Sequence, residues 1–235
     1  MGVVVHGAEV AAVPAALMAR WRAIPVPVAV DLAPERQIDP LVRALLPAGQ
    51  QADLFGRAVT ARCLPPDFGA VLEGVGRIGR GEVLVIDAGG SREVAVIGDV
   101  LGGELARKGV AGLVCDGAVR DTGNLARMAG LVCDGAVRDT GNLARMAGLP
   151  VYARWVNPRG PVGAAAGEVN GTVTVGGCEV APGDLVIGDA DGLVALPPAM
   201  LAELIEAAEA KLALEAEWTA RLRAGEPIGA IFGLP

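Results

Sequence analysis

The segment Glu82–Asp121 reads EVLVIDAGGSREVAVIGDVLGGELARKGVAGLVCDGAVRD, and its alternation of strand and helix patterns decides the fold. Its first six residues, Glu82–Asp87, form a short apolar run typical of a strand buried in a sheet. Val94–Ile97 predicts a second strand, and a helical stretch follows that ends at Gly109. Ala111–Cys115 predicts a third strand. Strands that alternate with helices predict parallel βαβ units, and therefore an α/β fold.

The flanking regions predict two further elements around this centre. The N-terminal part, about 8–50, mixes a helical pattern at about Ala8–Ala23 with proline-rich joints. After Glu168 come short strands joined by tight turns, and then one long amphipathic helix over about Pro198–Arg223. No stretch resembles a linker, so we expect a single domain over 1–235.

Composition excludes several functional classes. The 235-residue chain is 52% hydrophobic, carries a net charge of −7 and has no block of Lys and Arg, which argues against a nucleic-acid partner. No apolar run approaches the roughly 18 residues needed to span a bilayer, so we expect no membrane segment. The N-terminus also lacks the basic region of a signal peptide. The four cysteines have no CxxC spacing, which favours buried thiols in the cytoplasm over disulfides or zinc ligands.

A tandem duplication interrupts the α/β pattern. The block LVCDGAVRDTGNLARMAG occurs at Leu113–Gly130 and again, without a mismatch, at Leu131–Gly148. Repeats that build solenoids are usually longer, more numerous and diverged. The chain therefore carries two copies of one Arg-Asp pair, Arg120/Asp121 and Arg138/Asp139.

The first of these pairs stands at a defined distance from Asp99. Twenty residues separate Asp99 from Arg120. The helix after Asp99 advances about 14 Å at 1.5 Å per residue, and the following strand returns about 16 Å at 3.3 Å per residue. We therefore expect Asp99, Arg120 and Asp121 to share the sheet edge where open α/β folds bind ligands.

The residue types at this edge predict metal-assisted enolate chemistry on a 2-oxo acid. The helix start offers unpaired N–H groups to a carboxylate, with Gly102 and Gly103 permitting close approach. Arg120 offers paired donors to a carboxylate or a developing oxyanion. Asp121 is a suitable oxygen ligand for Mg²⁺ or Mn²⁺. Asp99 can orient a water molecule.

Structural roles would explain the same residues. An Arg-Asp dipeptide after a strand is often a solvated loop, and Asp99 also fits a helix cap. Asp87 lies before Gly89-Gly90, where a role in the turn is favoured over a place in the site. His6 is the only histidine and receives no role, which excludes His-based triads.

The chain resembles a known family through VLVIDAGG, GDVLGGELARKGVAGLVCDGAVRD, GLPVYAR, NPRGP and PGDLVIGDADGLVALP. The family contains regulator of ribonuclease activity A and the 4-hydroxy-4-methyl-2-oxoglutarate aldolases, and the resemblance covers roughly Ile24 to Glu226. The aldolase branch is marked by an Asp-x20-Arg-Asp motif, which Asp99, Arg120 and Asp121 match.

The resemblance implies an α/β/α layered fold of the phosphohistidine-swivelling-domain type, assembled as a homotrimer or hexamer. It implies a divalent-metal class II aldolase, a lyase that releases pyruvate from a 4-hydroxy-2-oxo acid and also decarboxylates oxaloacetate. Asp121 would ligate the metal, Arg120 would hold the substrate and stabilise the enolate, and Asp99 would hold a catalytic water. The amides of Val100, Leu101, Gly102 and Gly103 would hold the pyruvyl carboxylate. The alternative is a non-enzymatic regulator that binds a ribonuclease or another protein.

The duplication leaves two candidate positions for the Arg-Asp pair. The first copy has the correct spacing from Asp99. At the same interval before Arg138 the residue is Gly117, which has no acidic group. We therefore predict that Arg120 and Asp121 form the site, with Arg138 and Asp139 as the alternative.

Overall fold

A mixed sheet of ten strands is the centre of the computed structural model, which describes residues 2–129 and 148–233. Its main path runs β1-β8-β3-β4-β6-β7-β2, and β5, β11 and β12 extend it, while β9 and β10 form a separate hairpin. The strands are β1 Val4–Val5, β2 Arg43–Ala44, β3 Leu54–Arg62, β4 Glu82–Asp87, β5 Ala95–Ile97, β6 Gly112–Val119, β7 Val151–Val156, β8 Glu168–Val169, β9 Val173–Val175, β10 Cys178–Val180, β11 Leu185–Gly188 and β12 Leu193–Leu196.

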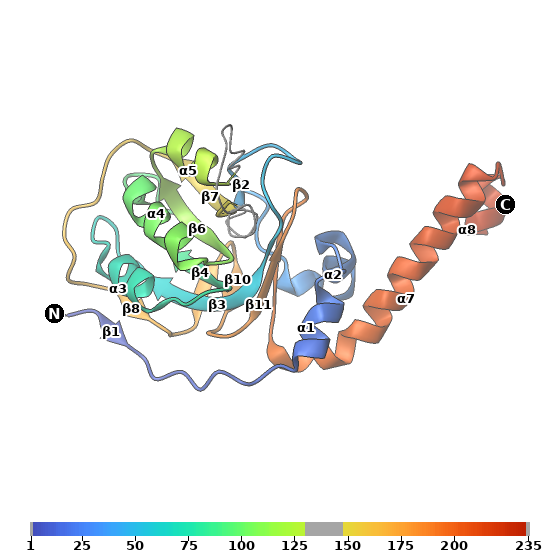
Figure 1. The fold of residues 1–235 in the computed structure, drawn as a ribbon, viewed down its shortest axis with the longest axis horizontal. Coiled ribbons are helices and arrows are strands. Elements are labelled where there is room, and N and C mark those ends of the chain that lie inside the picture. Colours follow the sequence, from blue (N-terminus) through green and yellow to red (C-terminus); the bar gives the residue numbers. More distant parts are fainter. Residues whose placement is uncertain (1, 130–147, 234–235) are drawn as a thin grey trace, which may run out of the picture.

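Helices cover one face of the central strands. Figure 1 shows α3, α4 and α5 together beside the sheet, whereas α1 and α2 lie at the base of the long α7. The predicted α/β fold with a C-terminal helix is confirmed. The helices are α1 Ala15–Trp21, α2 Val26–Leu32, the 3₁₀-helix η1 Pro34–Arg36, α3 Gly69–Arg77, α4 Asp99–Lys108, α5 Thr122–Ala129, α7 Pro198–Arg223 and α8 Ile228–Phe232.

The parallel strands β4 and β6 lie between β3 and β7 and are buried on both faces, which explains their mainly apolar sequences. In β4, Leu84 and Ile86 point into a core cluster with α3 and α4. Val83 and Val85 point to the opposite face, where the β9–β10 hairpin packs. This alternation places the hairpin and the helices on different sides of the sheet.

The N-terminal region is less helical than its sequence pattern indicates. The helix expected from Ala8 begins only at Ala15, directly after Pro14, and α2 begins after Pro25. Proline is favoured at helix starts but not inside helices, so each proline sets a boundary. After η1 the described residues up to position 50 contain only the short strand β2.

The C-terminal helix α7 has the predicted bounds, and only its beginning packs on the body. Leu201, Ile205 and Ala208 are buried there, and the Trp21 indole N–H donates to the Leu201 carbonyl at 3.0 Å. The remainder of α7 extends away from the sheet and carries α8 at its end (Figure 1). None of the described helices is long and apolar enough to cross a membrane.

Candidate active site

A cavity of about 400 Å³ lies between α4, α3 and the end of β6. Its polar lining residues are Asp99, Arg120 and Asp121, so the three groups selected from the sequence meet in one place. The remaining lining residues are glycines and apolar side chains: Phe68, Leu72, Ala95, Val96, Ile97, Gly98, Val100, Leu101, Gly160 and Pro161.

An irregularity in β6 delivers Arg120 to this cavity. The predicted end of this strand at Cys115 is wrong, since β6 continues to Val119. Its pairing with β7 shifts register between Cys115 and Ala118. A Cβ on Gly117 would lie only 2.6 Å from the Ala88 methyl, so glycine allows this close passage. The strand then ends with the Arg120 N–H donating to the Ile97 carbonyl at 3.1 Å.

Asp121 follows in a left-handed backbone conformation with φ of 54°. Aspartate tolerates this region better than most residues, and such outliers gather at functional sites. Its Oδ2 lies 3.4 Å from the Arg120 Nε and accepts a 3.3 Å hydrogen bond from the Asp99 N–H. The expected juxtaposition of the end of β6 and the start of α4 is therefore found.

Asp99 is the first residue of α4, and Gly98 rather than Asp99 is the N-cap. The Asn124 side-chain amide, from α5, donates to the Asp99 Oδ2 at 2.6 Å. This hydrogen bond is the main reason why the pKa of Asp99 lies below its usual value, and nearby Arg120 contributes further. Asn124 was missed in the sequence analysis. Only its place three residues after the Arg-Asp pair, on the first helical turn, could have indicated it.

The start of α4 supplies fewer free amides than expected. The Gly102 N–H already donates to the Gly98 carbonyl at 2.9 Å, so it is not available to a ligand. Gly103 lies one residue further into the helix, where N–H groups bond to the preceding turn. Val100 and Leu101 remain as cavity-lining residues ahead of that first helical bond.

The Arg120 side chain packs closely against two glycines. A Cβ on Gly98 would stand 2.9 Å from the Arg120 Cγ, and one on Gly160 would stand 2.6 Å from its Nη1. The loop that contains Gly160 is attached at both ends. The Ala95 N–H donates to the Arg159 carbonyl at 2.8 Å, and the Ala165 N–H donates to Asp67 at 2.9 Å.

The donor set agrees with a weakly held hard cation. Asp99 and Asp121 bring two carboxylates to an open cavity, and Mg²⁺ is commonly bound by one or two carboxylates together with water and substrate. Across residues 2–129 and 148–233 no group of three or more His, Cys, Asp or Glu side chains forms a denser metal cage. The carboxylates present therefore fit Mg²⁺ or Mn²⁺ better than a structural zinc ion.

The second copy of the duplicated block is not part of this description. Arg138, Asp139 and Cys133 lie outside the described residues. The geometry above therefore belongs to the first copy alone.

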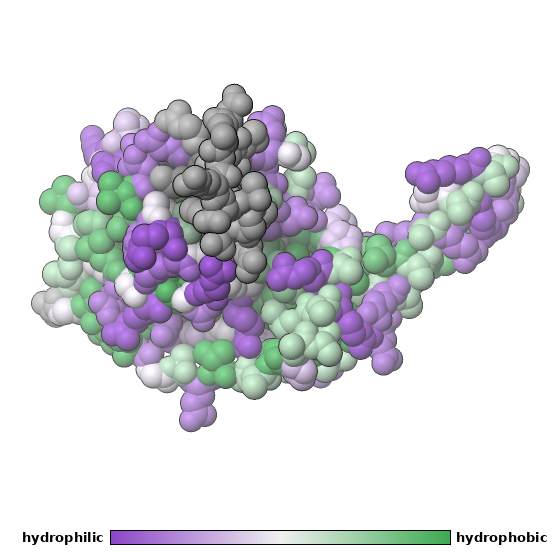
Figure 2. All heavy atoms as spheres, in the orientation of Figure 1, coloured by the Kyte–Doolittle hydropathy of each residue, from purple (hydrophilic) through white to green (hydrophobic). Residues whose placement is uncertain are grey.

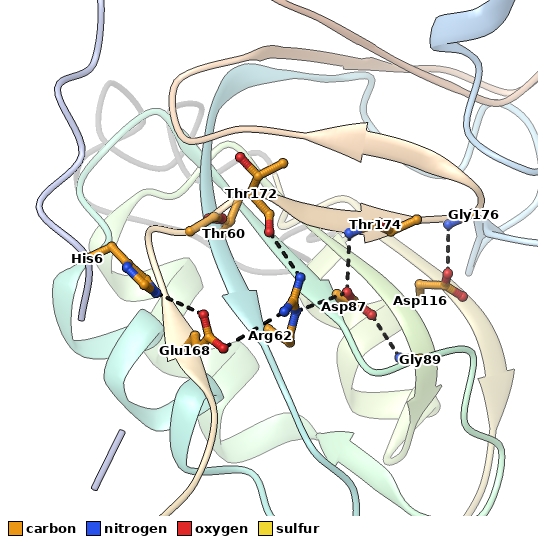
Figure 3. Close-up of polar contacts among 11 residues, drawn as sticks. His6, Thr60, Arg62, Asp87, Gly89, Asp116, Glu168, Thr172, Thr174 and Gly176 are labelled. Atoms are coloured by element: carbon orange, nitrogen blue, oxygen red, sulfur yellow. Dashed lines mark hydrogen bonds and ion pairs between the residues drawn. The ribbon is translucent and has the colours of Figure 1, made fainter. Parts of the chain in front are cut away.

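A second polar cluster lies at the ends of β3 and β4. Figure 3 shows His6, Glu168, Arg62 and Asp87 in a chain of contacts, with His6 Nε2 lying 2.8 Å from Glu168 Oε2. Asp87 accepts hydrogen bonds from the Gly89 N–H at 2.9 Å and from the β9 backbone at 3.2 Å. The turn role favoured for Asp87 is confirmed, and the cluster attaches strands rather than lining the cavity.

Asp116 makes a similar attachment one strand further along. It pairs with Arg154 and accepts a 2.7 Å hydrogen bond from the Gly176 N–H in the β9–β10 turn. Arg154 also binds Asp39 at 2.9 Å. These contacts fix the hairpin and the segment before β2 to the sheet.

A family model described as RraA-like, Aldolase/RraA, matches residues 31–129 and 124–195. The chain belongs to the RraA-like family. A curated relative from Halalkalibacterium halodurans, named "Putative 4-hydroxy-4-methyl-2-oxoglutarate aldolase", is 28% identical over 173 residues, covering 74% of this chain and 73% of the relative. A Pseudomonas aeruginosa protein with the same name is 32% identical over 152 residues, covering 65% of this chain and 82% of its own.

Solved structures of RraA-like proteins share the fold. The RNA-processing inhibitor RraA from Thermus thermophilis is 31% identical with a TM-score of 0.57, covering 72% of this chain and 90% of its own. RraAS2 of Streptomyces coelicolor is 23% identical with a TM-score of 0.70, covering 90% and 100% of the two chains. An uncharacterized Pseudomonas syringae protein matches 98% of this chain and 99% of its own, at 19% identity and a TM-score of 0.76.

Proposed function

We propose that this RraA-like protein is a divalent-metal-dependent class II aldolase. Its substrate is a 4-hydroxy-2-oxo acid of the 4-hydroxy-4-methyl-2-oxoglutarate type, cleaved to pyruvate, and it also decarboxylates oxaloacetate. The convergence of Asp99, Arg120 and Asp121 on one cavity carries this proposal. The aldolase names of its relatives support the reaction class.

Each side chain has a task that its position permits. Arg120 binds the oxygens of the pyruvyl group and stabilises negative charge as the C3–C4 bond breaks. Val100 and Leu101 line the same cavity at the start of α4, and the N–H groups of a helix start favour a carboxylate. Asp99, oriented by Asn124, holds the water that takes the C4 hydroxyl proton.

Asp121 would hold the divalent cation, with Asp99 acting on water nearby. When bound, Mg²⁺ or Mn²⁺ supplies Lewis-acid polarisation of the 2-oxo acid. The left-handed backbone at Asp121 directs its carboxylate towards the start of α4, where that ligand role would be exercised.

A direct assay tests this proposal. Purified protein is incubated with 4-hydroxy-4-methyl-2-oxoglutarate and, separately, with oxaloacetate, and pyruvate is measured. We expect activity that EDTA removes and Mg²⁺ restores. Metal-independent turnover, or no turnover with either acid at saturating Mg²⁺, would contradict the proposal.

A regulator function is the second candidate. It is favoured by the 31% identity to a structure described as an RNA-processing inhibitor. A regulator of this kind would form a stable complex with a ribonuclease and would need no metal. Co-purification with a ribonuclease, unaffected by Asp121→Ala, would support this function over catalysis.

We also propose that the protein assembles as a homotrimer or hexamer. Figure 2 shows apolar residues at the surface along the projecting part of α7, where Leu214 and Leu222 are each 43% exposed. An extended helix with uncovered apolar side chains is typical of an element that packs on a neighbour. We propose a cytoplasmic location as well, where thiols such as the free Cys63, Cys115 and Cys178 stay reduced.

A further inference from the structure

The polar lining residues of the cavity come from two elements, whereas its apolar lining comes from several, among them β5, α4 and α3. Asp99, Arg120 and Asp121 come from the start of α4 and the end of β6. Leu72 comes from the first turn of α3, and Phe68 is the N-cap residue of that helix. Phe68 and Leu72 therefore add an apolar surface from α3, an element that contributes no charged side chain to the cavity.

Phe68 and Leu72 form an apolar surface on one side of α3. The Leu72 N–H donates to the Phe68 carbonyl at 3.2 Å, so the two residues lie one helical turn apart on the same side of α3. Pro161, next to Gly160, completes this region, which we call the α3 wall. Leu72 remains 38% exposed although it lines a concave site. Exposed apolar side chains inside a cavity mark where an apolar group of a ligand is buried.

Arg120 is the cationic lining residue of the cavity and would orient a bound acid. Arg120 packs against Gly98 and Gly160, and in this position its guanidinium lines the cavity where it can meet the pyruvyl oxygens. Pyruvate alone is much smaller than a cavity of about 400 Å³. The part of the substrate beyond C3 must then extend into the rest of the cavity, which contains the α3 wall.

We propose that the α3 wall, formed by Phe68, Leu72 and Pro161, selects substrates whose C4 carbon carries an alkyl group. This inference rests on the proposed aldolase function and narrows its substrate class. In 4-hydroxy-4-methyl-2-oxoglutarate the group on the wall is the C4 methyl. A carboxymethyl group at the same position would bring a charged oxygen pair against apolar side chains without a partner.

Three substrates test the wall in the unmodified protein. The reference substrate is 4-hydroxy-4-methyl-2-oxoglutarate. The second substrate, 4-hydroxy-2-oxoglutarate, lacks only its C4 methyl, and we expect kcat/KM to be lower by at least about fourfold. In 4-carboxy-4-hydroxy-2-oxoadipate a carboxymethyl group replaces the methyl, and we expect a fall of at least about tenfold. Equal or faster cleavage of the carboxymethyl substrate would overturn the proposal.

A charge placed on the wall gives the converse test. Leu72→Arg should reverse the preference between the methyl and carboxymethyl substrates. Gly76→Arg is the matched control, because it adds the same charge one turn further along α3 outside the cavity, where a side chain meets open space. If the ratio of kcat/KM for the two substrates is unchanged in Leu72→Arg, the proposal is overturned. Light scattering would then show whether the oligomeric state has changed. A changed state would identify a second copy of the chain as the occupant of the wall.

Exchange of the pyruvate methyl protons in D₂O separates this inference from the function on which it rests. Exchange requires enolate formation but no group at C4. No exchange and no cleavage would refute the aldolase function itself. Exchange without a preference for the methyl substrate would refute only the role of the α3 wall.

Discussion

The side-chain amide of Asn124 donates a 2.6 Å hydrogen bond to the carboxylate of Asp99. This contact joins α5 to Asp99, the first residue of α4, which lines the cavity. Because Asn124 belongs to the first copy of the duplicated block, the contact also ties that copy to the site.

We expect Asn124→Ala to lower kcat by roughly tenfold to a hundredfold, since a small displacement of a reacting group has effects of this size. Asp99 keeps its charge in this variant but loses the donor that orients it. Steady-state kinetics for pyruvate release provide the measurement. Asn142→Ala removes the corresponding residue of the second copy and should leave the rate unchanged.

The two duplicated aspartates form a matched pair of variants. Asp121→Ala should reduce activity at least about a hundredfold and weaken activation by Mg²⁺, because a metal contributes several kcal/mol to charge stabilisation. Asp139→Ala should have little effect. The measurement is the activity of each variant as a function of Mg²⁺ concentration. If only Asp139→Ala lost activity, the site would belong to the second copy.

Gly160→Ala should raise KM with a smaller effect on kcat. The new methyl would stand 2.6 Å from the Arg120 Nη1, and the anchored loop leaves the guanidinium as the group that moves. Gly76→Ala, where a methyl meets open space, is the control. The melting temperature should be unchanged in both variants. A lower melting temperature in Gly160→Ala would show that the loop, and not the Arg120 side chain, is displaced by the new methyl.

Arg154→Ala should lower the free energy of unfolding by about 3 kcal/mol, because it leaves Asp116 without its ion-pair partner. The Arg154 and Asp116 side chains are 12% and 9% exposed. Urea denaturation would measure the change. Arg107→Ala, which removes a surface ion pair with Glu104, should change the midpoint little.

The hydrogen bonds of Asp67 predict how the free energy of unfolding depends on pH. Three backbone N–H groups donate to its carboxylate, and these bonds hold its pKa below the usual value. A lowered pKa stabilises the folded state fully above the unfolded value of about 3.9, and this stabilisation is lost as the pH falls from there through the lower pKa of the folded state. Asp67→Asn should therefore be less stable than the wild type at pH 7, and the difference should narrow at pH 3. A constant difference would contradict this account.

Several elements were predictable because their signals are local. The apolar run Glu82–Asp87 and the long helix Pro198–Arg223 appear with the expected bounds. Gly109 ends α4 in a left-handed conformation, as its sequence position predicts. Even the meeting of Asp99 with Arg120 follows from the rise per residue of a helix and a strand.

Other features could not be predicted from local sequence patterns. The extension of β6 through Gly117 depends on its neighbour β7, which lies far along the chain. The contact between Gly160 and Arg120 depends on how a distant loop crosses the cavity. Sequence spacing gave no signal for either of them.

The sequence by itself determined which side chains can perform the chemistry and, through short-range periodicity, which elements carry them. Tertiary structure alone decided how much room those side chains have, which partners orient them and which apolar surface faces the substrate. The reason is physical: hydrogen bonds within helices and turns join residues a few positions apart, whereas packing and cavities join residues whose separation in the sequence sets no distance.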